Sequence, residues 1–487
     1  MKDVTLLPAV RQLELLRAGE LSVAELAEAH IGQIERLNPA LNAFADFDAE
    51  RVRAEARRLD AASRDASKGT RGPLHGLPVT VKSSIATAGY RCEIGSLLHE
   101  GDVPSEDAVV VARLRAAGAL ILGTTNCPEF LMAYETANLL HGRTRNPWDL
   151  ERTPGGSSGG ESAAIAAGMS AAGLGSDSGG SVRVPAHFTG ICSLKPTPGR
   201  IPGAGHLPPC VGPFSTLGAI GPMARTMQDV SLLFRVLSGQ DRHDPASPPV
   251  ALREPSVEAL RGNTIGVFED DGLLPVTAET RAAVRAAADA LRSEGFRVEP
   301  FRPRTLEPLR QLWWKFFVQC GAMFYAPAIR GKEDRLSPIF REFLRIAEAP
   351  PPLTAASLLD AWAELDLLRA ETLAEMDEHP VVLCPVASLP AFRHEERTWT
   401  IEGRAVDYLD AVRHTQWFNV LAAPAAVAPV GRSSEGLPIG VQIVARPFED
   451  ETALGVAAIV DAAFGYRPPA MATLSSIALL PLTPYCL

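Results

Sequence analysis

The sequence predicts an α/β protein, because short apolar runs that suit buried strands alternate with helix-like segments along the chain. The clearest case is the apolar run Leu77–Lys82, which is followed by a helical pattern over Glu106–Ala117 and a second short strand at Ala119–Leu122. The pattern returns near the end, where Ile439–Val444 suits a strand and Asp450–Ala463 a helix. We therefore expect strands and helices to alternate through all 487 residues.

Local signals place several further elements. Ser22–Glu25 has the form of a capping box, in which a serine and a glutamate close the start of a helix. A second helix is expected over about Asp48–Arg64, and later strands are expected at Thr264–Phe268 and Val381–Leu383. A polar, Pro-rich stretch over about 241–262 indicates a loop insertion.

The composition is that of an ordinary globular protein, with 46% hydrophobic and 21% charged residues. No apolar run reaches the roughly 18 residues that a membrane-spanning helix needs, so we expect no membrane span. Acidic residues outnumber basic ones, 57 to 47, and the basic residues are scattered, which argues against a nucleic-acid partner. The first residues lack the apolar core of a secretory signal, and we therefore expect a cytoplasmic protein.

The cysteines and histidines do not indicate a metal site. The 7 cysteines form no CxxC or similar ligand spacing, and no HExxH occurs among the 10 histidines. We expect the cysteines to be reduced and mostly packed in the interior. The sequence therefore predicts neither a metal nor another cofactor.

Two glycine-rich turns, Gly155–Gly160 and Asp177–Arg183, are the most informative segments, because each contains a candidate nucleophile, Ser157 or Ser181. Such turns can bind phosphate through backbone N–H groups, but no Gly-Lys-Ser/Thr completes a nucleotide-binding loop. The nucleophile elbow GxSxG is a closer alternative, and it fails because Arg183 stands where its second glycine belongs. Both serines remain candidates for covalent chemistry of another kind.

Lys82 is the candidate base. A serine hydroxyl is a weak nucleophile that needs a neighbouring base, and a lysine kept neutral by burial can act as one. Lys82 ends the apolar run Leu77–Lys82, where a side chain would lose its contact with water. A serine nucleophile and its base are thus available without a histidine.

With these residues the chain resembles the amidase-signature family of serine hydrolases. The resemblance implies the amidase-signature fold, which is one large α/β/α domain over residues 1–487 with a central mixed, twisted β-sheet flanked by helices. The signature core would occupy about 70–215. The segments that carry the resemblance are Gly76–Lys82, Gly123–Asn126, Asn146–Trp148, Gly155–Gly160, Gly179–Ser181 and Leu437–Gln442.

The resemblance also implies a role for each residue of the site. Ser181 would attack the substrate carbonyl, Ser157 would relay its proton, and Lys82 would accept the proton and return it to the leaving group. Ser157 is expected to follow a cis peptide bond. Asp177 and Arg183 would hold the nucleophile loop by an ion pair or hydrogen bonds. The other expected site residues are the oxyanion-hole donors Ser178, Gly179, Gly180 and Ser181 and the pocket residues Phe130, Leu131 and Met132.

One residue departs from the family pattern, because Ser83 follows the lysine where the family usually has aspartate. This leaves the hydrogen bonding around the lysine strand open. The region of about 300–350 is rich in aromatic residues, mainly between Leu309 and Arg345. It is expected either to pack as core helices or to form a variable wall of the substrate pocket. The apolar tail at 472–487 is expected to be disordered or to pack on the surface.

The predicted function is hydrolysis of amide C–N bonds, together with ester or carbamate bonds, in small apolar or aryl substrates. This describes a broad aryl amidase or urethanase that acts as a monomer or homodimer. The alternatives are a narrow amidase for small amides, a catalytically inactive binding protein, and the glutaminase subunit of a tRNA-dependent amidotransferase. The last usually carries glutamine after the loop arginine, where this chain has Val184.

Overall fold

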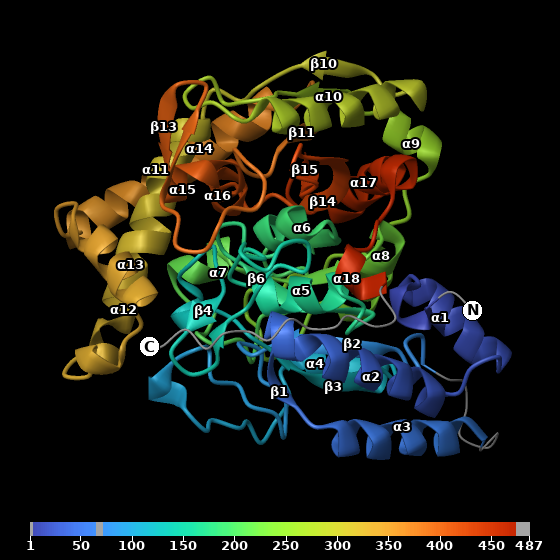
Figure 1. Cartoon of the computed structure of the whole chain (residues 1–487). Coiled ribbons are helices and arrows are strands. Elements are labelled where there is room, and N and C mark those ends of the chain that lie inside the picture. Colours follow the sequence, from blue (N-terminus) through green and yellow to red (C-terminus); the bar gives the residue numbers. More distant parts are fainter. Residues whose placement is uncertain (1–2, 65–71, 474–487) are drawn as a thin grey trace.

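The computed structural model describes residues 3–64 and 72–473, so most of the apolar tail lies outside the described residues (Figure 1). One large sheet joins parallel and antiparallel strands, which confirms the predicted α/β fold with a mixed central sheet. In sheet order its strands are β1 (Phe44–Phe47), β3 (Leu120–Thr125), β2 (Pro78–Lys82), β6 (Ala172–Asp177), β8 (Ala219–Ala224), β7 (Cys192–Lys195), β14 (Ala425–Arg432), β15 (Pro438–Ala445), β11 (Val381–Pro385), β9 (Ile265–Val267) and β10 (Val298–Pro300).

Two small antiparallel pairs lie outside this sheet, β4 (Ala137–Asn138) with β5 (Gly142–Arg143) and β12 (Thr398–Ile401) with β13 (Arg404–Asp407). A π-helical turn over Trp314–Gln319 joins two of the helices. The α-helices are α1 (Ala9–Ala18), α2 (Val23–Leu41), α3 (Ala49–Arg64), α4 (Val109–Ala116), α5 (Gly159–Ala166), α6 (Arg183–Thr189), α7 (Pro213–Leu217), α8 (Met227–Leu237), α9 (Val257–Arg261), α10 (Ala278–Ser293), α11 (Leu306–Trp313), α12 (Cys320–Ile329), α13 (Pro338–Glu348), α14 (Ala355–Glu375), α15 (Tyr408–Ala411), α16 (Arg413–Val420), α17 (Asp450–Phe464) and α18 (Ala470–Thr473).

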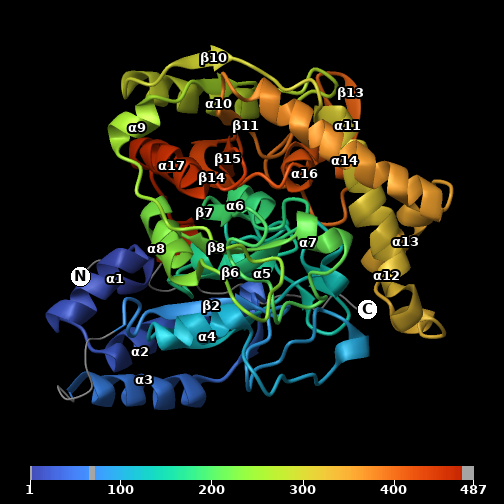
Figure 2. The same ribbon diagram turned by 180° about the vertical axis from the view of Figure 1, so that it is seen from behind.

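Helices cover both faces of the sheet, as the two opposite views show (Figures 1 and 2). Side chains alternate between the two faces along a strand, so successive residues of β14 pack into different parts of the core. Ala426 and Ala428 belong to the large core that includes α10 and α17. Val427, between them, packs instead with Val184 and Phe188 of α6. Strands buried on both faces explain why these segments are almost wholly apolar.

Several local predictions are confirmed. Ser22 and Glu25 form the capping box, and α3 covers almost the whole of the second predicted helix. β3 continues beyond the predicted end at Leu122 as far as Thr125, because these added residues pair with β1 and β2. The local sequence pattern does not indicate a strand pairing of this kind, because the paired segments are distant in the sequence.

The segment between Gly155 and Gly180, which is rich in Gly, Ala and Ser, contains the helix α5 and the strand β6, neither of which the sequence analysis predicted. Every residue of both is buried. Gly160 shows why small residues are needed, because a Cβ there would lie 2.5 Å from the Asn126 carbonyl oxygen and 2.6 Å from that of Ala43. The small residues of this segment therefore allow neighbouring backbone segments to approach closely.

The 241–262 segment is mostly irregular and ends in the short helix α9. Residues 306–348 form α11, the π-helical turn, α12 and α13, which lie together at one side of the molecule (Figure 1). None of the helices within the described ranges has both the length and the apolar character needed to cross a membrane.

The centre of the sheet positions the candidate site. β2 lies between β3 and β6 and runs parallel to both. The carboxyl ends of parallel strands meet at one edge of a sheet, where ligands commonly bind. Lys82 ends β2 and Asp177 ends β6, so this pairing brings the predicted base and the predicted nucleophile loop to the same edge.

Candidate active site

Lys82 lies against the turn that precedes α5. Its Nζ atom donates a hydrogen bond to Ser157 Oγ at 2.6 Å and another to Ser176 Oγ at 3.1 Å. The lysine has no exposed surface. The peptide bond between Gly156 and Ser157 is cis, as expected. The predicted base and the first predicted serine are therefore in direct contact.

Burial changes the acidity of this lysine. It lowers the pKa of Lys82 from 10.5 to about 8, although the nearby Cys127, Asp177 and Glu161 act in the opposite direction. With a pKa of about 8, roughly a tenth of the side chain is neutral at pH 7. A buried amine of this kind can accept a proton near neutral pH.

Two buried residues beside Lys82, which are Ser176 and Glu161, were not identified from the sequence. Glu161 Oε2 accepts a hydrogen bond from Thr125 Oγ1 at 2.8 Å, and Oε1 accepts one from Thr80 Oγ1. Burial raises the pKa of Glu161 to about 8. Its partners lie in two different strands, β3 and β2, so no local sequence pattern marks the contact.

Ser157 and Ser181 line one pocket. No carboxylate, ammonium or guanidinium group occurs among the described residues that line it. Burial lowers the pKa of His206 in this wall to about 4, which leaves the imidazole uncharged at neutral pH. The other lining residues are Phe130, Leu131, Met132, Ser176, Ser178, Pro208, Pro209, Cys210, Phe214 and Phe317.

The pocket walls come partly from predicted and partly from unforeseen segments. Phe130, Leu131 and Met132 lie where they were expected, whereas the segment from His206 to Phe214 was not predicted. In the aromatic region, Phe317 lines the pocket while Phe316 and Phe340 have no exposed surface. Both interpretations of that region therefore hold, each for different residues.

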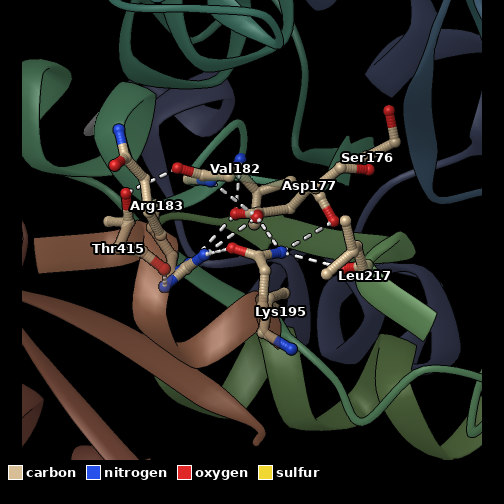
Figure 3. Close-up of polar contacts among 12 residues, drawn as sticks. Ser176, Asp177, Val182, Arg183, Lys195, Leu217 and Thr415 are labelled. Atoms are coloured by element: carbon tan, nitrogen blue, oxygen red, sulfur yellow. Dashed lines mark hydrogen bonds and ion pairs between the residues drawn. The ribbon is translucent and has the colours of Figure 1, made fainter. Parts of the chain in front are cut away.

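Asp177 and Arg183 form a buried ion pair at the base of the nucleophile loop. Figure 3 shows the carboxylate facing the guanidinium and the backbone of Val182. Arg183 Nη2 lies 2.9 Å from Asp177 Oδ1, and Nε donates to Oδ2 at 3.0 Å. Both side chains are fully buried, so this is not a solvated surface pair. Burial alone would raise the pKa of Asp177, but Arg183 outweighs it and holds the pKa below its usual range.

Replacing Asp177 by asparagine is expected to lower the free energy of unfolding by about 3–5 kcal/mol, because it leaves a buried guanidinium without its counter-charge. Urea unfolding followed by circular dichroism measures this. Glu14→Gln is the control, since it breaks an exposed ion pair with Arg11 and should cost less than about 1 kcal/mol. Equal stability of the two variants would show that the buried pair contributes little.

The family model described as Amidase matches residues 25–454. The chain belongs to the amidase family. It is 34% identical over 481 residues to a glutamyl-tRNA(Gln) amidotransferase subunit of Roseiflexus sp. (strain RS-1), with 91% of this chain and 93% of that protein covered. It is 32% identical over 461 residues to an indoleacetamide hydrolase of Bradyrhizobium diazoefficiens, with 93% and 86% covered.

A solved structure agrees with this assignment. A bacterial aryl acylamidase of the amidase-signature family has a TM-score of 0.84 at 25% identity, with 97% of this chain and 99% of that chain covered. The resemblance inferred from the sequence motifs is thereby confirmed. The protein is an amidase-signature hydrolase of C–N bonds.

Ser83 stands where aspartate was expected from the family pattern, and the structure shows which contacts this serine makes. The Ser83 N–H donates to the Thr125 carbonyl oxygen at 3.0 Å, and Ser83 Oγ lies 3.3 Å from Cys127 Sγ. Ser83 is buried, so its hydroxyl contacts the protein interior and not solvent. The lysine strand is therefore tied to β3 and the residues after it without a carboxylate.

The four predicted oxyanion-hole donors of the amidase are not equivalent. The Gly180 N–H donates to Asp177 Oδ1 at 2.7 Å, so this group is already used within the loop. In the part of the chain that the structure describes, the N–H groups of Ser178, Gly179 and Ser181 have no protein acceptor. These three remain free to bind an oxyanion.

Proposed function

We propose that the amidase cleaves the carbonyl–nitrogen bond of its substrate through an acyl-enzyme on Ser181. The observation that carries this is the 2.6 Å contact of buried Lys82 with Ser157, which shares the pocket with Ser181. Ser181 and Ser157 line the same pocket, and Ser157 contacts a base that is buried away from water.

In the proposed first step, Ser181 Oγ attacks the carbonyl carbon and passes its proton to Ser157 Oγ. Ser157 passes its own proton to the neutral amine of Lys82, which becomes an ammonium. The same relay then returns the proton to the leaving nitrogen as the C–N bond breaks. Water then attacks the acyl-enzyme and passes its proton along the same relay to Lys82. The relay returns a proton to Ser181 Oγ as the acid is released.

Negative charge develops on the carbonyl oxygen during both attacks. The free N–H groups of Ser178, Gly179 and Ser181 are the proposed donors to it. Removing one such donor typically costs about 2.7–4 kcal/mol of transition-state stabilisation. Because Gly180 is bonded to Asp177, its proposed part is to shape the loop instead.

The walls of the pocket support an apolar or aryl substrate. Phe130, Met132, Phe214 and Phe317 surround the two serines, and the lining carries no charged group among the described residues. Free glutamine has an ammonium and a carboxylate that would lose their hydration there without a charged partner. We therefore propose a broad aryl amidase or urethanase over a glutaminase, although several relatives, among them the Roseiflexus protein, carry the name of an amidotransferase subunit.

A nitroanilide series with growing acyl chains tests this proposal. Each buried methylene contributes about 0.8 kcal/mol, so two added methylenes should raise kcat/KM by up to about tenfold. A matching aryl carbamate should also turn over, and glutamine should be a poor substrate. A clear preference for glutamine, or rates that fall with each methylene, would refute the apolar pocket and favour one of the two alternatives, a small-amide amidase or a glutaminase.

A further inference from the structure

We infer that Trp313 is a positioning residue for catalysis, because its indole fixes the peptide unit that presents the Gly179 N–H to the oxyanion. The inference rests on the proposed function, since it assumes an oxyanion beside Ser181. It assigns a role to a residue of the aromatic region that does not itself line the pocket.

Trp313 holds the peptide unit between Ser178 and Gly179. Trp313 Nε1 donates a hydrogen bond to the Ser178 carbonyl oxygen at 2.9 Å. A trans peptide unit is planar, so its C=O and N–H groups point in opposite directions. The Gly179 N–H therefore points away from Trp313, and it has no acceptor among the described residues.

Three hydrogen bonds hold the next peptide unit, between Gly179 and Gly180. The Gly179 carbonyl oxygen accepts hydrogen bonds from Tyr134 Oη at 2.7 Å and Thr415 Oγ1 at 2.6 Å. The N–H of the same unit donates to Asp177. This unit cannot turn without losing three hydrogen bonds, so the Gly179 N–H is fixed from both sides.

Close packing leaves the loop little freedom. A Cβ at Gly179 would lie 2.8 Å from Trp313 Cζ2 and 2.9 Å from Tyr134 Oη, so both rings contact the backbone directly. Gln416 Nε2 donates to Tyr134 Oη at 3.3 Å, and Gln416 Oε1 accepts from Arg310 Nε at 3.0 Å. Arg310 and Trp313 both belong to α11, so one helix supports both peptide units.

The same indole connects the loop to the substrate pocket. The rings of Trp313 and Phe317 stack, with centroids 4.9 Å apart and an interplanar angle of 16°. Phe317 lines the pocket beside Ser181. A substrate group that packs on Phe317 is therefore separated from the indole, and so from the oxyanion loop, by a single ring.

Trp313→Phe tests the inference, because phenylalanine keeps an aromatic ring against Phe317 and removes the N–H donor together with part of the indole ring. We expect kcat to fall about 10- to 100-fold while KM changes little, since the lost hydrogen bond acts on the transition state. Trp314→Phe is the matched control for the lost ring volume, because that indole meets the ring of Trp313 and the Arg310 guanidinium but makes no hydrogen bond to the loop among the described residues. It should retain near-normal kcat.

Inhibitor binding separates this role from a merely structural one. A trifluoromethyl ketone forms an anionic hemiketal with Ser181, so its affinity for Trp313→Phe should fall in proportion to kcat/KM. The affinity for the corresponding neutral alcohol should stay unchanged. If Trp313→Phe does not fold, Tyr134→Phe combined with Thr415→Val is measured in the same way, since it removes both donors to the Gly179 carbonyl.

Equal kcat for Trp313→Phe and Trp314→Phe, in a protein that Ser181→Ala inactivates, would overturn the inference and leave the proposed function intact. Parallel loss of ketone and alcohol affinity would also overturn it, because the indole would then support the pocket and not the oxyanion. Full activity of Ser181→Ala would instead overturn the proposed function itself.

Discussion

Ser181→Ala is expected to lower kcat by a factor on the order of 10⁶, because it removes the hydroxyl that we propose to form the acyl-enzyme. Hydrolysis of a nitroanilide measures the loss. A fluorophosphonate should add covalently to Ser181 of the unaltered protein, which peptide mass mapping would locate. The alanine variant should bind no label.

Ser178→Ala is the matched control for this experiment. It removes a hydroxyl from the same pocket and keeps the backbone N–H that we assign to the oxyanion hole. We expect its kcat to stay within about tenfold of normal, because the hydroxyl has no assigned part in the chemistry. Label on Ser157 or Ser178, with normal activity of Ser181→Ala, would show that another serine is the nucleophile.

Lys82→Met is expected to lower kcat by up to about 10⁴-fold, because methionine fills the buried site but cannot accept a proton. The same lysine should set the pH profile. Its amine is a base only when neutral, so kcat/KM should fall about tenfold per unit as the pH drops below the pKa of about 8. Above that pH the rate should level off.

Lys195 provides the control for the pH profile, because it is also fully buried and burial lowers its pKa to about 7. Its Nζ donates to the Pro196 carbonyl oxygen at 3.0 Å, and the described structure gives it no hydrogen bond to Ser157 or Ser181. Lys195→Met should therefore keep the rising limb near pH 8. Loss of that limb in Lys195→Met, with a normal profile in Lys82→Met, would show that Lys195 and not Lys82 is the base.

Much of the candidate chemistry could be predicted from the sequence because its signals are local. A lysine at the end of an apolar run and two serines in glycine turns identify Lys82, Ser157 and Ser181 as candidates. The strand and the turns are made by residues adjacent in sequence, so their pattern survives without the rest of the fold. The capping box at Ser22 is predictable for the same reason.

The supports of the site could not be predicted in this way. Tyr134, Trp313 and Thr415 converge on two carbonyl groups of one loop, and they come from distant parts of the chain. Nothing in their own neighbourhoods distinguishes them from ordinary core residues. The pocket wall from His206 to Phe214 was missed likewise, because an irregular segment has no periodicity to indicate which way its side chains face.

The sequence by itself therefore determined the α/β class and the candidate residues for the proposed reaction, since both depend on short patterns of residue type and spacing. The tertiary structure alone decided which N–H groups of the nucleophile loop are free. That depends on the hydrogen bond that Asp177 accepts from the loop and on those that Tyr134, Trp313 and Thr415 donate to it, of which the last three exist only once remote elements are packed together. It also decided the pKa of Lys82, because burial follows from the strands on either side of β2 and not from the residues within it.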